Sequence, residues 1–85
     1  MPEISRFYGL ILYLNFRDHN PPHVHAKYGD FEATITIEDG IIKGEMPRRA
    51  LNMVFEWMEL HKSELLTEFN NAQNGLPIKN IEPLK

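Results

Sequence analysis

Residues 23–38 read HVHAKYGDFEATITIE, two runs of alternating apolar and polar residues separated by Gly29-Asp30. Such alternation is typical of β-strands, and glycine at the first central position of a two-residue loop favours a type II′ hairpin turn. A loop of this length fixes which residues lie opposite each other. The resulting pairs are Tyr28 with Phe31, Ala26 with Ala33, Val24 with Ile35, Lys27 with Glu32, His25 with Thr34, and His23 with Thr36. Since apolar residues meet apolar ones and polar meet polar, the sequence predicts a hairpin with one apolar and one polar face.

A second turn signal, Asp39-Gly40, follows this hairpin and favours a type I′ turn. It predicts a third strand that places Ile42 beside Ile37, Lys43 beside Thr36 and Glu45 beside Thr34. The polar face of the sheet would then carry two rows of side chains. The rows are His23, Thr36 and Lys43, and His25, Thr34 and Glu45.

A further strand is expected upstream, over residues 8–16. Its two faces alternate between one set of strongly apolar residues and another of mixed character. The apolar set is Leu10, Leu12, Leu14 and Phe16, and the mixed set is Ile11, Tyr13 and Asn15.

Downstream, the spacing of apolar residues predicts one long amphipathic helix. Pro47 suits a first helical position, and Asn74-Gly75 suits the end of a helix. The tail beyond it can dock on the core or add an edge strand through Ile78, Ile81 and Leu84. The apolar residues of the helix are Ala50, Leu51, Val54, Phe55, Met58, Leu65, Leu66 and Phe69.

The predicted fold class is α+β, an antiparallel meander sheet of three to four strands packed on one long amphipathic helix, with a short C-terminal docking segment or edge strand. A chain of 85 residues with 42% apolar residues can form one core, so residues 1–85 are expected to be a single domain. The net charge of −3 argues against a broadly basic nucleic-acid-binding surface, although a local basic patch is compatible with it. There is no cysteine for disulfide or thiolate chemistry, and no apolar run suits a signal or membrane segment, so a cytoplasmic location is expected.

The segment from Asp18 to His25, DHNPPHVH, holds three of the four histidines of the chain. Alternation along a strand sends His23 and His25 to the same face, and two prolines stiffen the loop before them. Histidine titrates near neutral pH and is a common metal ligand. The alternative is that Asp18 and His19 form a turn before the prolines and that the strand histidines lie on a wet sheet face.

Two kinds of chemistry fit this segment. In a catalytic site built from Asp18, His19, His23 and His25, the strand histidines would share the roles of general base and general acid. In a metal site, His23 and His25 would be ligands, and His19 or Asp18 would complete a set of three around a divalent ion such as zinc, with a position left open for water. No other cofactor is expected.

A second group of candidate site residues consists of basic side chains that could bind an anion. Arg48 and Arg49 fall in the first turn of the expected helix, where positive charge opposes the helix dipole. An anion bound there with Lys43, or phosphate steadied by Arg17, is the functional interpretation. The alternative is that the arginines pair with acidic neighbours such as Glu45.

The chain as a whole resembles, nearly end to end, a family of short bacterial proteins called domain of unknown function 4160. The resemblance rests on five motifs. They are the opening MPEISRFYG, the block DHNPPHVH at residues 18–25, Lys43-Gly44 before MPRRA at residues 46–50, the helix from Glu56-Trp57 to Glu64-Leu65, and the closing IEPL at residues 81–84.

The resemblance implies a bacterial or phage protein that is often encoded beside another short gene, an arrangement that suggests a toxin-antitoxin module. It assigns no catalytic residue. The expected partners are a protein encoded by the neighbouring gene and RNA, with no membrane, and a homo-oligomer is left open. A non-catalytic adaptor or antitoxin that docks through Tyr8, Ile11 and Tyr13 and a small metalloprotein are the competing hypotheses.

Overall fold

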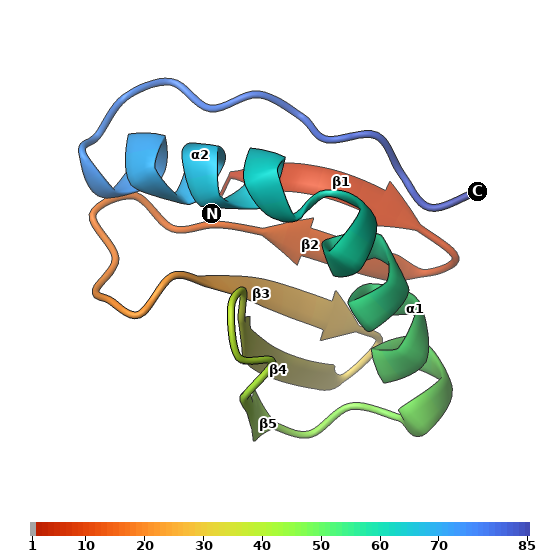
Figure 1. Ribbon diagram of the computed structural model, residues 1–85. Coiled ribbons are helices and arrows are strands. Elements are labelled where there is room, and N and C mark those ends of the chain that lie inside the picture. The colour runs from red at the N-terminus through yellow and green to blue at the C-terminus, as the bar shows by residue number, and fades with distance from the viewer. Residues whose placement is uncertain (1) are drawn as a thin grey trace.

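The computed structural model describes residues 2–85, which form a five-stranded antiparallel meander followed by two helices (Figure 1). The strands lie side by side in chain order. The α+β class and the meander are confirmed, but the sheet has one strand more than the largest number expected. The elements are β1 (Glu3–Phe7), β2 (Leu10–Tyr13), β3 (His23–Tyr28), β4 (Phe31–Thr36), β5 (Ile42–Gly44), α1 (Arg48–Leu60) and α2 (Lys62–Gln73).

The hairpin of β3 and β4 has the predicted register, with His23 opposite Thr36 and His25 opposite Thr34. Gly29 takes a φ of +58°, as the first central residue of a type II′ turn does. Both histidines therefore lie on the polar face of the sheet.

The predicted register between β4 and β5 is wrong by two residues. Lys43 lies opposite Thr34 instead of Thr36. The cause is a longer loop, because the amide of Thr36 donates to the carbonyl of Ile41 at 3.0 Å and leaves four residues between them. Only Gly40 of the Asp39-Gly40 pair takes a positive φ, so no type I′ turn forms. The rows across the polar face change accordingly, and one of them is His25, Thr34 and Lys43.

The first strand of the sheet, β1, was not expected from the sequence. It pairs with β2 through a two-residue turn in which Tyr8 and Gly9 take φ values of +48° and +84°, the signs that a type I′ turn requires. Tyrosine is an unusual residue at such a position. The expected strand over residues 8–16 is therefore reduced to β2, and its first residues belong to the turn.

The expected long helix is divided at His61, which takes φ −122° and ψ 24°. The imidazole Nδ1 of His61 lies 2.8 Å from Glu64 Oε1 in the first turn of α2. Apolar residues continue at helical spacing from Met58 to Leu65 across the break, and no proline or glycine marks it. The bend lets the two helices follow the twisted sheet, a feature that periodicity alone does not reveal.

Both helices cover the apolar face of the sheet, and the core lies between the helices and the sheet. Trp57 of α1 and Leu65 of α2 are fully buried there, and strand residues of the polar face are not part of this core. The buried cluster comprises Ile4, Phe7, Leu10, Leu12, Leu14, Val24, Ala26, Ile35, Ile37, Ala50, Val54, Trp57, Met58, Leu65, Phe69, Ala72 and Ile81.

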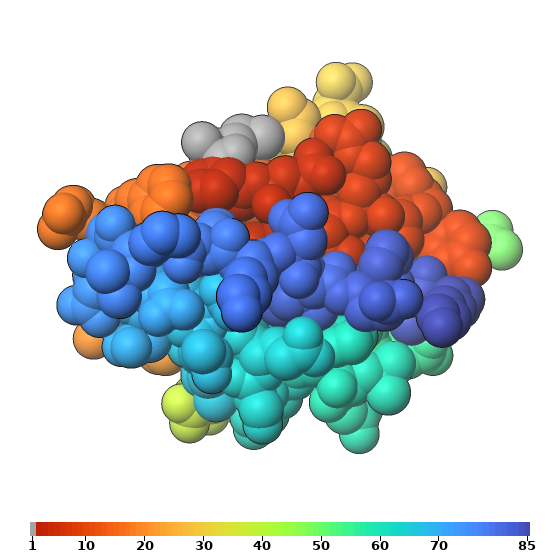
Figure 2. Space-filling model, turned by 90° about the horizontal axis from the view of Figure 1, so that it is seen from above, coloured from red at the N-terminus to blue at the C-terminus, as the bar shows by residue number. Residues whose placement is uncertain are grey.

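The C-terminal tail docks on the core without forming a strand. It runs across the molecule between β1 and the helices (Figure 2). The amide of buried Ile81 donates to the carbonyl of Ile4 at 2.7 Å, and the indole of Trp57 donates to the carbonyl of Glu82 at 2.8 Å. The docking segment is thus confirmed, and the alternative of an edge strand is wrong. Within the described chain, no helix has the length and apolar character needed to cross a membrane.

Gly44 is expected to tolerate no side chain. Its φ is +108°, and an added Cβ would clash with the carbonyl oxygen of Glu32. We expect Gly44→Ala to lower the free energy of unfolding by about 1–3 kcal/mol, measured by urea denaturation. Gly29→Ala is the matched control, because Gly29 also has a positive φ, +58°, but an added Cβ there meets no atom within 4 Å, so this substitution carries the backbone strain without the clash. Equal losses for the two variants would contradict the steric explanation.

Candidate functional site

The segment of residues 14–22, between β2 and β3, carries Asp18 and is held against the C-terminal end of α2. The amide of Arg17 donates to the carbonyl of Ala72 at 2.8 Å. The side-chain amide of Gln73 donates to the carbonyl of Asp18 at 3.2 Å and to Asn20 Oδ1 at 3.1 Å. These contacts fix Asp18 beside the start of β3.

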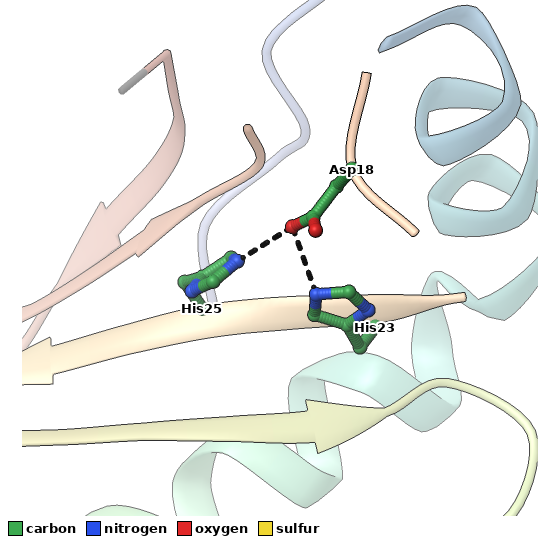
Figure 3. A group of neighbouring side chains, drawn as sticks. All are labelled: Asp18, His23 and His25. Atoms are coloured by element: carbon green, nitrogen blue, oxygen red, sulfur yellow. Dashed lines mark hydrogen bonds and ion pairs between the residues drawn. The ribbon is translucent and has the colours of Figure 1, made fainter. Parts of the chain in front are cut away.

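The carboxylate of Asp18 joins the two strand histidines (Figure 3). Its Oδ2 lies 2.9 Å from His23 Nε2 and 3.0 Å from His25 Nε2. The other oxygen, Oδ1, accepts a hydrogen bond of 2.9 Å from the amide of His19. One carboxylate oxygen therefore lies between two ring nitrogens, an arrangement that the DHNPPHVH segment builds almost alone.

Each histidine ring is also held by a second group. His23 is buried, with its Nδ1 at 2.8 Å from the carbonyl of Pro21 and its ring beside that of Phe69. His25 is stacked on Tyr13, with ring centroids 4.9 Å apart and planes at 16°. The side-chain nitrogen of Asn15 lies 3.3 Å from His25 Nε2.

Burial acts to raise the pKa of the Asp18 carboxyl, but its hydrogen bonds outweigh this effect. The bond with His25, the bond from the His19 amide and the neighbouring His23 ring together hold the pKa below its ordinary value. Burial, with a smaller contribution from Glu32, raises the pKa of Tyr13. At neutral pH the site therefore has a carboxylate at its centre and a neutral phenol beside it.

The cluster opens into a pocket of about 260 Å³ on the polar face of the sheet. Lys43 reaches this pocket from β5, and the side chain of His19 is 82% exposed at its rim. The imidazole nitrogens of three histidines and the ammonium group of Lys43 thus surround the single carboxylate of Asp18. The positive charge of Lys43 can attract an anionic ligand to this pocket. The pocket is lined by Asn15, Asp18, His19, Pro21, His23, His25, Thr34, Thr36, Ile41 and Lys43.

The other residues expected to bind an anion lie elsewhere. Arg49 borders a separate hollow with Tyr8 and Met53, and neither Arg48 nor Arg49 lines the pocket of Asp18. Over residues 2–85 no ion pair is formed between these arginines and Glu45 or another acid, so the pairing alternative is not realised. The guanidinium of Arg17 lies against Gly75, outside the pocket.

Of the two candidates for the third member of the expected metal set, Asp18 and His19, the structure brings Asp18 to the strand histidines. The donor atoms of Asp18, His23 and His25 lie within 4.8 Å of one another. The other candidate, His19, has its Nε2 3.7 Å from Asp18 Oδ1, and its side chain is 82% exposed. His19 therefore lies beside the cluster instead of within it.

The sequence did not identify Tyr13 and Asn15 as parts of the site. Tyr13 was expected on a docking surface with Tyr8 and Ile11, yet it is buried opposite His25. Its position depends on the register between β2 and β3, which no short turn fixes. The alternation of residues 10–15 does place Tyr13 and Asn15 on the same face of their strand. Only the pairing of β2 with β3 shows that this face lies beside His25.

Comparison with known proteins found one family. The model described as Domain of unknown function (DUF4160) matches residues 9–70, a region that includes Asp18, both strand histidines and Lys43. No match was found among curated proteins or among solved structures.

Proposed function

The chain belongs to the DUF4160 family, and we propose that it is a component of a two-gene module of toxin-antitoxin type that acts on RNA at the pocket of Asp18, His23 and His25. The observation that carries the proposal is the convergence of these side chains and Lys43 on one pocket. The two-gene part follows from the gene arrangement that the family resemblance implies. The partner would be the product of the neighbouring gene.

The pocket offers each group that cleavage of an RNA phosphodiester needs. A base removes the proton of the 2′-hydroxyl, whose oxygen attacks phosphorus. The bond to the 5′ oxygen then breaks, and an acid protonates that leaving oxygen. Lys43 is placed to steady the negative charge on the phosphate oxygens. The products are a 2′,3′-cyclic phosphate and a free 5′-hydroxyl.

The burial of the histidines favours a different division of roles from the one expected. His23 is 6% exposed, and both of its ring nitrogens face protein oxygens, so it positions Asp18. His25 has more access to the pocket, and His19 is largely exposed at its rim. We therefore assign proton transfer to His25 and His19 and orientation to Asp18 and His23.

The test is bacterial growth after induced expression of the wild type, of His25→Ala and of the wild type together with its neighbouring gene. We expect growth arrest by the wild type, loss of arrest in His25→Ala, and relief by the neighbour. Total RNA from arrested cells should contain fragments with cyclic phosphate ends. The matched control is His61→Ala, which removes a histidine bonded to Glu64 at the break between the helices.

Two outcomes would contradict the proposal. Arrest that persists in a folded His25→Ala variant would place the activity elsewhere on the molecule. A folded wild type that causes no arrest, yet binds the neighbouring gene product, would favour the non-catalytic adaptor or antitoxin.

A further inference from the structure

The three side chains of the cluster present their donor atoms to one point. Asp18 Oδ2 is 2.9 Å from His23 Nε2 and 3.0 Å from His25 Nε2 (Figure 3), and the side-chain nitrogen of Asn15, 3.3 Å from His25 Nε2, would move aside for an ion. Ligands of a tetrahedral zinc ion, about 2.0–2.2 Å from the metal, lie about 3.3–3.6 Å from one another. The two distances to Asp18 Oδ2 are a few tenths of an ångström shorter than this, and all three donor atoms lie within 4.8 Å of one another, so rotations of the side chains would admit an ion.

The hydrogen bonds around His23 are compatible with a metal ion between its ring and Asp18. The carbonyl of Pro21 can only accept, so His23 Nδ1 carries the proton at that 2.8 Å contact. In the neutral ring, Nε2 then holds a lone pair directed at a carboxylate oxygen 2.9 Å away. Either a proton on Nε2 or a metal ion between the two atoms removes this opposition. A metal ion leaves the bond to Pro21 in place as the outer contact that metal-bound histidines usually make.

The other two ligands are held in place as well. The ring of His25 is fixed by stacking on Tyr13, and the second oxygen of Asp18 is occupied by the amide of His19. Gln73 holds the backbone of Asp18 from α2. The donor atoms are therefore ordered before any ion binds, which lowers the entropic cost of binding.

We propose that Asp18 Oδ2, His23 Nε2 and His25 Nε2 bind a divalent transition-metal ion and leave the pocket side of that ion open. Two imidazoles and one carboxylate suit zinc, iron(II) or manganese, whereas calcium and magnesium prefer oxygen ligands throughout. Three protein ligands with an open position are typical of catalytic sites. The open side faces the pocket that contains Lys43.

This inference deepens the proposed function, since it rests on the same pocket and assigns a chemical role within it. With the ion bound, the ring nitrogens of His23 and His25 are ligands, and a water on the open position takes over the proton transfer assigned to His25. Lys43 keeps its role toward phosphate oxygens.

Metal binding is measured directly on the purified chain without a histidine tag, after removal of ions with a chelator. Zinc and manganese are titrated by calorimetry, and cobalt(II) is followed by its visible absorption, which reports the coordination geometry. We expect one ion per chain. We also expect His25→Ala and Asp18→Asn each to weaken binding by more than the about 10- to 100-fold that loss of an outer contact costs.

The variants are chosen to separate binding from folding. His25 and Asp18 are partly exposed, so their replacement disturbs the core less than that of buried His23. His61→Ala serves as the control and should bind the ion like the wild type. Circular dichroism verifies that each variant is folded.

Iron(II) is tested under anaerobic conditions. The inference is overturned if the folded wild type binds neither iron(II) nor any of the other ions at one ion per chain. It is also overturned if binding survives in both His25→Ala and Asp18→Asn. Binding without growth arrest would defeat the proposed function alone, and histidine-dependent arrest without binding would defeat this inference alone.

Discussion

Trp57→Ala is expected to lower the free energy of unfolding by about 3–5 kcal/mol. Trp57 is fully buried, its ring contacts that of Phe7 with centroids 5.6 Å apart, and its indole nitrogen donates to the carbonyl of Glu82. The substitution would leave a large cavity and release the tail from α1. Since domains are stabilised by about 0.05–0.15 kcal/mol per residue, this loss is a large part of the whole for so short a chain.

Urea denaturation followed by circular dichroism measures the effect. Leu60→Ala is the control on the same helix, because Leu60 is 67% exposed and its loss should change stability by less than about 0.5 kcal/mol. Trp57→Phe keeps an aromatic ring and removes the hydrogen bond to Glu82, so it should fall between the two. A loss in Trp57→Ala no greater than in Leu60→Ala would show that the docked tail and α1 do not depend on this residue.

The parts of the fold that were predicted are those set by local rules. Gly29-Asp30 fixed the register of β3 and β4, because a two-residue turn leaves one way to pair the strands. The pairing of β4 with β5 failed for the opposite reason. The loop that follows Thr36 is longer than the two residues that an Asp-Gly turn would leave. As a result, the pairing of β5 with β4 is shifted by two residues.

The break at His61 and the strand β1 show the same limit. Apolar residues continue at helical spacing on both sides of His61, so periodicity predicts an unbroken helix, whereas the backbone leaves the helical conformation at His61. In β1 a bulge between Glu3 and Ser5 disturbs the alternation that would have marked a strand.

The part of the candidate site that could be predicted is the part contributed by the single segment of residues 18–25. Alternation placed His23 and His25 on one face, and the same short loop supplied Asp18. Tyr13 and Lys43 come from strands whose registers depend on the rest of the sheet. The sequence therefore indicated which residues meet at the centre of the site and placed Lys43 on the same face, but it put Lys43 opposite the wrong threonine and did not identify Tyr13 or Asn15.

Phe69→Ala is expected to lower the free energy of unfolding by about 3–5 kcal/mol and also to disturb the site. Phe69 is 3% exposed on α2, and its ring lies 5.5 Å from that of His23. It belongs to the hydrophobic core, and it packs against the histidine that faces Asp18. Loss of the ring would therefore let His23 rotate away from Pro21 and Asp18.

Urea denaturation measures the stability, and nitrogen-15 NMR of the imidazole rings measures the protonation and hydrogen bonding of His23 in the folded fraction. Phe69→Leu fills most of the space and should restore much of the stability, while the His23 signals shift less than in Phe69→Ala. Phe16→Ala, at a residue 49% exposed, is the aromatic control. If Phe69→Ala loses stability while the His23 signals stay unchanged, the loop around Pro21 and Asp18 alone holds the ring, and the core of the protein does not determine the geometry of the site.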